Sequence, residues 1–335
     1  MKISIFDVAK KAGVSVVTVS RVLNDFPSVR EKNRQKVLQA IKELDYRPNS
    51  AARSLAMGKT GVIGLTLTTL QDTLFDGIIK SVNDALKEHG YFLALSIEPE
   101  TAETANGESS NFLYQEDRVD GIILLSPLNE ERDVLELKRK KIPFVLVDNQ
   151  LEDTSASVVN VDNYMGGLTA TRHLLGLGHT RIAHVCGPAL YRSARERKRG
   201  YMDAMAEAGL TPYLMVDSDF NIRDGYEIAK SWLAGGECPT AVFAADDFIA
   251  LGIVEAFRDA GRHVPQDLSV IGYDDQAFSA DIHPRLTTIR QPAEGIAQEA
   301  VKLLLRIKSG AQRRNASIKL EPELVVREST TVCRP

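Results

Sequence analysis

Hydrophobic residues recur at two different spacings along the chain, and the change between them falls near residue 60. In residues 1–60 they are spaced for three short amphipathic helices, and no run alternates as a strand does. The residues expected to face inward are Ile5, Val8, Ala9 and Ala12, then Val19, Val22 and Leu23, then Val37, Ile41 and Leu44. Two helices joined through the short sequence AGVS predict a helix-turn-helix.

Cap residues mark the ends of these helices. Ser4 and Asp7 have the S-x-x-D spacing of an N-terminal capping box, and Gly13 should end the first helix. Ser15 can cap the second helix. The third helix is expected over residues 31–44.

After Gly61 the pattern changes to short apolar strands separated by amphipathic helices. The expected strands are GVIGLTL, YFLALSI, GIILLS, PFVLVD, SVVNVD, RIAHVC, TAVFAAD and LSVIGYD. This alternation predicts parallel sheets covered by helices on both faces. About 270 residues and eight strands favour two doubly wound lobes, with a crossover near residues 160–165 and a tail after Leu286 that returns to tie the lobes together.

The charge is divided in the same way as the pattern. The whole chain carries a net charge of −4, yet residues 1–60 hold twelve Lys and Arg against five Asp and Glu, which gives +7 and leaves −11 for the rest. A basic module beside an acidic body suits contact with phosphates.

One face of the second helix has the chemistry of a DNA-reading surface. Opposite its inward stripe it presents a small, mixed set of side chains. An arginine can fork to guanine and a valine can pack on a thymine methyl group, while hydroxyls near the helix start suit phosphates. The residues of this face are Val16, Val17, Ser20, Arg21 and Asn24, with Ser15 and Thr18 at the start.

Three of the expected strands run into acidic residues: Asp148, the pair Asp246–Asp247, and the pair Asp274–Asp275. Ligands of doubly wound sheets bind beyond the carboxyl ends of the strands. Carboxylates that converge there can accept several hydroxyl hydrogen bonds, which is the chemistry of a polyol or sugar. Asp247 and Asp275 are instead interpreted as structural caps.

Long, ordered motifs resemble those of the LacI/GalR repressor family over nearly the whole chain. They are IFDVAKKAGVSVVTVSRVLN, LDYRPNSAARSLA, NYMGGLTATRHLLGLGHTRIAHVCGP, SARERKRGY, PTAVFAADDFIALG, VPQDLSVIGYDD and PRLTTIRQP. The resemblance implies an α/β protein with an all-α helix-turn-helix headpiece and a hinge helix, followed by a two-lobed, periplasmic-binding-protein-like domain of doubly wound parallel sheets. The expected boundaries are 1–48 for the headpiece, 49–60 for the hinge and linker, and 61–335 for the ligand-binding and dimerisation domain.

The resemblance also assigns DNA contacts. Val16, Val17 and Arg21 would read bases, and residues 49–56 would form a short helix in the minor groove with Leu55 as a wedge between base pairs. The complete set of expected DNA-binding residues is Ile5, Phe6, Ser15, Val16, Val17, Thr18, Ser20, Arg21, Asn24, Asn49, Ala52, Arg53 and Leu55.

For the effector, the resemblance makes Arg197 the residue that forks onto ligand oxygens, Asp274 its acidic partner and Phe220 a stacking aromatic. Asp246 stands where the family often has Asn. Arg195, Lys198 and Arg199 are interpreted as solvated helix charges, and Asp72 and Phe75 as parts of the loop after the first strand. The expected effector-binding residues are Asp72, Phe75, Asp148, Arg197, Phe220, Asp246, Asp274 and Gln291.

Other classes of protein lack support in the sequence. No phosphate-binding, hydrolase, zinc-protease or dinucleotide motif is present, so no enzymatic activity, metal or cofactor is expected. No secretory signal or membrane-spanning run is present, which predicts a cytoplasmic protein. The expected partners are a palindromic DNA operator, a small sugar-like effector and a second copy of the chain. Two alternatives stay open: a sugar-binding protein of a transport system, and a regulator that answers to a protein co-regulator.

Overall fold

A computed structural model describes residues 3–23, 26–46, 59–70, 73–98, 111–115, 118–236, 238–312 and 314–334. The chain divides into two compact units, Met1–Gly61 and Val62–Pro335. None of the helices within the described ranges combines the length and hydrophobicity that crossing a membrane requires.

The first unit contains the three helices that the sequence predicts: α1 (Ile5–Ala12), α2 (Val16–Leu23) and α3 (Glu31–Leu44). They pack on a small core in which Val8, Val19 and Val37 are fully buried. Ile41 and Leu44, which were also expected to face inward, are partly buried against this core. A three-helix unit of this size has room for little more than one apolar residue per helix turn.

The predicted caps are confirmed. The backbone N–H and the hydroxyl of Ser4 both donate to the Asp7 carboxylate, at 2.9 and 2.7 Å. Gly13 ends α1 in the left-handed region at φ 64°, a conformation that glycine adopts without strain. The Thr18 backbone N–H donates to the Ser15 hydroxyl at 3.2 Å. Arg30 contributes no side-chain cap to α3.

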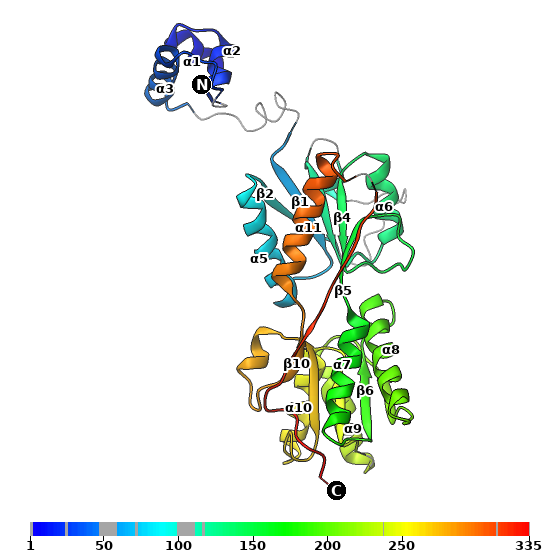
Figure 1. Cartoon of the computed structure of the whole chain (residues 1–335). Coiled ribbons are helices and arrows are strands. Elements are labelled where there is room, and N and C mark those ends of the chain that lie inside the picture. Colours follow the sequence, from blue (N-terminus) through cyan, green and yellow to red (C-terminus); the bar gives the residue numbers. More distant parts are fainter. Residues whose placement is uncertain are drawn as a thin grey trace. The chain divides into compact units, whose positions relative to one another are not determined.

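The second unit contains two six-stranded sheets, as the alternation predicts (Figure 1). The N-lobe sheet has the order β11-β5-β4-β3-β1-β2 and the C-lobe sheet β12-β10-β9-β8-β6-β7. All described pairings are parallel except that of β10 with β12. The strands are β1 (Val62–Leu67), β2 (Phe92–Ile97), β3 (Gly121–Leu125), β4 (Phe144–Val147), β5 (Val158–Val161), β6 (Ile182–Cys186), β7 (Leu214–Asp217), β8 (Ala241–Ala244), β9 (Ser269–Asp274), β10 (Thr287–Arg290), β11 (Ser317–Leu320) and β12 (Glu323–Val325).

Helices cover these sheets and bury their apolar stripes against them (Figure 1). In the N-lobe, α5 and α11 pack together on one core and α6 belongs to a second. In the C-lobe, α7 packs on α8, and α9 packs on α10. The helices are α5 (Thr73–Glu88), α6 (Glu130–Arg139), α7 (Asn163–Gly176), α8 (Arg192–Glu207), α9 (Ile222–Gly235), α10 (Asp247–Asp259) and α11 (Ala293–Lys308), with short 3-10 turns η1 (Phe112–Tyr114) and η2 (Ala277–Ala280).

The chain passes between the lobes three times. It enters the C-lobe between β5 and α7, returns between β10 and α11, and crosses again between β11 and β12. The predicted crossover near residues 160–165 and the predicted returning tail are both confirmed. The last segment therefore adds β11 to the N-lobe sheet beside β5, and β12 to the C-lobe sheet beside β10 (Figure 1).

Candidate functional site

Backbone strain occurs in four residues at the ends of three strands. Ser126, Asp148, Asp274 and Asp275 have φ values of 48°, 54°, 103° and 53°, in the left-handed region that side chains with a Cβ rarely adopt. All four stand at or directly after the carboxyl ends of β3, β4 and β9. Strain of this kind concentrates at binding sites, where the surrounding structure holds a side chain in a required position.

Arg197 lies at the centre of a polar cluster in the C-lobe, although its side chain is almost fully buried. Its guanidinium donates to the Asn163 amide oxygen at 2.9 Å, to the Ala245 carbonyl at 2.6 Å and to Asp274 Oδ1 at 3.3 Å. The guanidinium also lies over the Tyr273 ring, 3.6 Å from the ring centre. Multiple charge-assisted hydrogen bonds and this stacked contact fix the direction of the guanidinium.

Close packing of two helices positions Arg197. At Gly200 on α8, an added Cβ would lie 2.3 Å from the Tyr164 carbonyl oxygen; at Gly167 on α7, it would lie 2.3 Å from the carbonyl oxygen of Arg197 itself. Only glycine permits such an approach between helix backbones. The two helices therefore pack as one block that carries Arg197.

Two further expected effector residues, Gln291 and Phe220, have described contacts in the C-lobe. The Gln291 amide donates to Asp274 Oδ1 at 2.6 Å, so this carboxylate accepts from both Arg197 and Gln291. Phe220 lies against the backbone of Gly187, where an added Cβ would come within 2.3 Å of the ring. We name the set Arg197, Asn163, Asp274 and Gln291, with the nearby carboxylates Asp148 and Asp246, the Arg197 cluster.

Burial raises the pKa of the two remaining carboxylates of the Arg197 cluster, Asp148 and Asp246. Asp148 accepts a hydrogen bond from the Ser126 hydroxyl at 3.0 Å. For Asp246, burial raises the pKa well above its usual range, and the charge of Asp274 adds to this shift. Oδ1 of Asp246 accepts the backbone N–H of Ile249 at 2.7 Å and so caps α10.

Asp247 and Asp275 make structural contacts, but neither is the cap that the sequence predicts, because Asp246 caps α10. Asp247 accepts hydrogen bonds from Thr288, Ser279 and the backbone of Gln276, and burial raises its pKa to about 7. Asp275 pairs at 2.7 and 2.6 Å with two arginines that fasten the C-terminal tail, Arg290 and Arg327.

Arg195 is exposed, as expected for a solvated helix charge, but it also has a structural role. Arg195 donates to the carbonyl oxygen of Gln150, which follows β4 in the N-lobe, at 3.1 Å. The Gln150 side-chain oxygen in turn accepts the backbone N–H of Arg192 at 2.9 Å. Glu130 accepts the Gln150 backbone N–H at 2.6 Å from the N-lobe side. The loop after β4 is thus fastened to the N-terminus of α8 and links the two lobes beside the Arg197 cluster.

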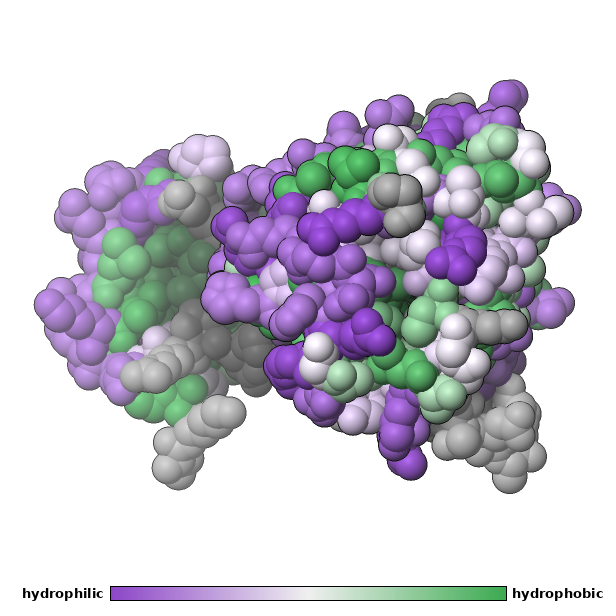
Figure 2. All heavy atoms as spheres, turned by 90° about the horizontal axis from the view of Figure 1, so that it is seen from below, coloured by the Kyte–Doolittle hydropathy of each residue, from purple (hydrophilic) through white to green (hydrophobic). Residues whose placement is uncertain are grey.

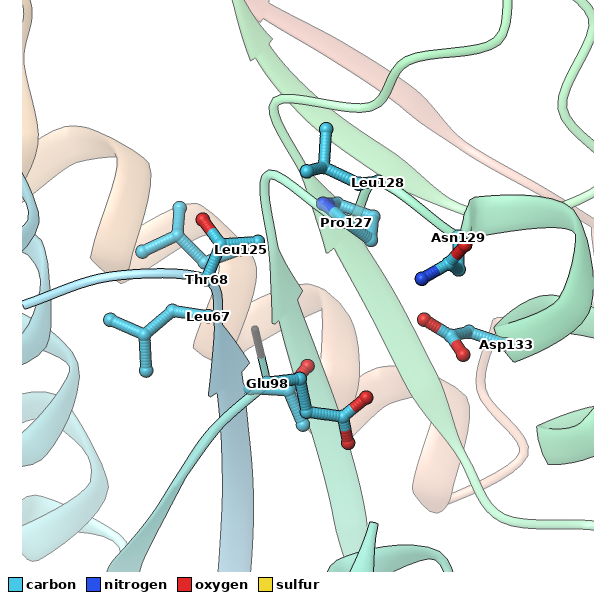
Figure 3. A pocket seen from close by; sticks show the side chains of 9 residues that line it. Leu67, Thr68, Glu98, Leu125, Pro127, Leu128, Asn129 and Asp133 are labelled. Carbon is cyan, nitrogen blue, oxygen red and sulfur yellow. The ribbon is translucent and has the colours of Figure 1, made fainter. Parts of the chain in front are cut away.

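The placement of Phe75 in a loop is wrong. Phe75 lies in the first turn of α5, where it is half-buried against the N-lobe core. Asp72 lies outside the described residues. A small pocket does open at this edge of the sheet, after β1, β2 and β3, with Thr68, Glu98 and Asp133 among its lining residues (Figure 3). None of the expected effector residues that the structure describes lines this pocket.

In the first unit, the face of α2 opposite the core is accessible. Val17 is 60% exposed and Arg21 is exposed, while Val16 and Ser20 are partly covered. The Ser15 hydroxyl is 2.9 Å from that of Thr18, so the two expected phosphate ligands bond to one another. On α1, Phe6 is 70% exposed and Ile5 is partly buried against the core. The expected residues Asn24, Asn49, Ala52, Arg53 and Leu55 lie outside the described residues.

Sequence reasoning missed three partners in this region: Asn163, Gln150 and Ser126. Each makes its decisive contact with a residue 22 to 42 positions away in the chain. The only local signal is a position soon after a strand: Ser126 directly follows β3, and Gln150 lies in the loop after β4.

A helix-turn-helix unit joined to a two-lobed unit with a buried polar cluster at its strand ends defines a DNA-binding regulator with a ligand-binding domain. A family model described as bacterial regulatory proteins of the lacI family matches residues 4–49, and one described as a periplasmic binding protein-like domain matches residues 171–330. The chain belongs to the LacI family of bacterial regulatory proteins, and it is a DNA-binding transcriptional repressor, not an enzyme.

Similar proteins extend over the whole length. The HTH-type transcriptional repressor PurR of Haemophilus influenzae (strain PittEE) is 37% identical over 97% of this chain and 98% of its own. A crystal structure of the lac repressor dimer bound to operator and the anti-inducer ONPF has a TM-score of 0.88 and 29% identity, over 99% of this chain and 100% of that one. A complex of the transcriptional regulator CelR with cellobiose has a TM-score of 0.74 and 32% identity, over 98% and 99%.

Proposed function

We propose that this repressor binds a palindromic operator as a dimer and regulates genes of carbohydrate use, under the control of a small sugar-like effector. The observation that carries the effector class is the Arg197 cluster, in which carboxylates at several strand ends surround a guanidinium from α8. Carboxylates accept the hydrogen bonds of hydroxyl groups and a guanidinium donates to hydroxyl oxygens, which together suit a polyol. The cellobiose bound by the related CelR regulator supports the same class.

The fastening between the lobes supports allosteric control. An effector shifts an equilibrium only if it binds one arrangement of the protein better than another. Arg197 on α8 stands five residues after Arg192, whose backbone holds the Gln150 side chain of the N-lobe. A ligand that binds Arg197 therefore acts on α8, the helix whose N-terminus is hydrogen-bonded to the N-lobe. We propose that the arrangement of the lobes in turn sets the spacing of the two copies of residues 49–56 in the dimer.

DNA recognition is proposed for the exposed face of α2, with Val17 and Arg21 as base-reading residues and Val16 beside them. A bidentate contact from an arginine to guanine supplies discrimination at one base pair. Residues 49–56 are proposed to enter the minor groove as the hinge.

The first experiment selects an operator from random duplexes and measures affinity for it and for unrelated DNA. Arg21→Ala should weaken operator binding by about 1–3 kcal/mol and relax the preference at one base pair, because a single base contact is lost. Lys10→Ala, a phosphate-directed control, should weaken all sequences alike. Equal losses on operator and unrelated DNA for Arg21→Ala would contradict the assignment.

The second experiment titrates the operator complex with a panel of sugars and, because the relatives include PurR repressors, purine bases. A sugar that changes operator affinity supports the proposal. Arg197→Ala should keep full operator affinity and lose the response, since Arg197 lies in the second unit. A response to purines alone would replace the proposed effector class, and no response to any small molecule would favour a protein co-regulator.

A further inference from the structure

The charges of the Arg197 cluster do not balance. Three carboxylates, Asp148, Asp246 and Asp274, act electrostatically on Arg197. Arg197 donates a hydrogen bond to only one of them, Asp274. The other hydrogen-bonding members, among the residues that the structure describes, are amides and a hydroxyl and carry no charge. The cluster thus has two more carboxylates than cations.

Neighbouring cations do not remove this excess. Arg192 also acts on Asp148, but it pairs with Glu196 at 3.0 Å, and the Glu196 charge opposes its effect on Asp148. Three charged residues act on Asp246: Asp274 at the end of β9, Asp247 in α10 and Arg197 in α8. Two of these three neighbours are acidic. The N-terminus of α10 offers about half a positive charge.

Among the three carboxylates, Asp246 has the least compensation of its charge, because the charges of Asp274 and Asp247 act on it more strongly than that of Arg197. It is 3% exposed, and the cap of α10 uses only its Oδ1 atom. No described residue donates a hydrogen bond to its other oxygen. A carboxylate that is withdrawn from water without a cation either holds a proton or pairs with a cation that arrives.

On the basis of the proposed function, we infer that the effector is an amino sugar and that its ammonium group pairs with Asp246. An ammonium brings a full positive charge and three donors, whereas a hydroxyl brings one donor and no charge. The hydroxyls of the same sugar suit Asp148 and Asp274, and its ring face suits Phe220. In the free protein Asp246 holds a proton, and the arriving ammonium displaces it. Binding therefore releases up to about one proton from this residue.

Calorimetric titration of the full-length protein at pH 7 tests this inference. The probes are glucosamine, galactosamine and mannosamine, each beside its neutral parent sugar. At least one amino sugar should bind about tenfold or more tightly than its parent, which is the usual gain from a charged hydrogen bond. Repeating the titration in two buffers of different ionisation enthalpy should show proton release with the amino sugar only.

Two variants separate the charge of Asp246 from its structural role. Asp246→Asn keeps the cap of α10, because Asn caps helices as well as Asp does. This variant should lose the preference for the amino sugar and the proton release that comes from Asp246. Asp217→Asn removes an 82% exposed carboxylate on β7 and should change neither. Tight binding of a neutral parent without an amine preference, or a preference that survives Asp246→Asn, overturns this inference alone. Failure of all six sugars to bind overturns it together with the proposed effector class.

Discussion

Asp246 links the electrostatics of the Arg197 cluster to the stability of the fold. Because its pKa is raised in the folded protein, folding takes up a proton above the usual carboxyl range, and the contribution of this group to stability is lost as the pH rises beyond that range. Burial raises the pKa of Asp247 to about 7 and that of Asp133 to about 6, and these groups act in the same direction.

Asp246→Asn should therefore raise the melting temperature more at pH 8 than at pH 5, because the variant has no proton to lose at this position. Thermal unfolding followed by circular dichroism at both values measures the difference. Asp217→Asn, on the surface, serves as the control and should shift both melting temperatures alike. A variant that gains no more at pH 8 than at pH 5 would show that Asp246 does not titrate in this range.

At this scale, residue type and position after a strand were enough to predict the three carboxylates of the Arg197 cluster, while Arg197 and Gln291 were assigned from the family resemblance. The sequence pattern identifies these three members of the cluster, because an acid follows an apolar run at Asp148, Asp246 and Asp274. The pattern does not identify Asn163 and Gln150, because an amide after a strand is common in any turn. Their roles depend on which residue of a distant helix arrives opposite them, and the sequence pattern carries no information on that pairing.

Among the elements, the block formed by α7 and α8 has the tightest constraint. Gly200→Ala places a methyl group 2.3 Å from the Tyr164 carbonyl oxygen, so the helices must separate. We expect a loss of about 1–3 kcal/mol in unfolding free energy and a weaker effector response, since Arg197 moves with α8. Urea unfolding and effector titration measure the two effects.

Gly176→Ala is the matched control, because it lies at the end of α7 with no atom within 4 Å of the added Cβ. It should leave the response intact and change stability by at most about 1 kcal/mol, in the favourable direction. If Gly200→Ala behaves like Gly176→Ala, the helix pair is not the support of Arg197 that the contacts indicate.

A hydrophobic pattern is sufficient to predict those strands that are buried on both faces of a sheet. All eight predicted strands are present, and most lie in the middle of a sheet, where continuous apolar runs are buried on both faces. Four strands escaped prediction. β7, β11 and β12 are edge strands of three or four residues with alternating or partial exposure. β10 is internal, but its buried Thr287 and Thr288 are satisfied by hydrogen bonds to distant side chains instead of forming an apolar run.

For the whole molecule, the proposed dimer needs a surface, and β2 offers one. β2 is the outer strand of the N-lobe sheet, and its Phe92, Leu95 and Ile97 are 77%, 45% and 49% exposed. Side chains of α5 and β2 line a groove beside it. The face drawn in Figure 2 mixes hydrophilic and hydrophobic residues. We propose that a second copy covers the β2–α5 surface, because an unpaired strand edge with apolar side chains favours association.

Leu95→Glu should then shift sedimentation from dimer to monomer at micromolar concentration and weaken binding to a palindromic operator, because two half-sites need two linked headpieces. Leu135→Glu alters an equally apolar, 62% exposed residue on α6 and should leave the dimer intact. A dimer that survives Leu95→Glu and dissociates with Leu135→Glu would place the interface on the other side of the lobe.

The triple crossing of the chain has a consequence for how the protein is made. A ribosome releases the chain from its N-terminus, so α1 to α3 can fold early, as local contacts alone define them. The N-lobe, in contrast, lacks α11 and β11 until residues 293–320 have emerged, and the C-lobe sheet gains β12 only after that. A nascent chain thus presents its helix-turn-helix unit long before either lobe is complete, and the ligand-binding unit is the last part of the protein to be finished.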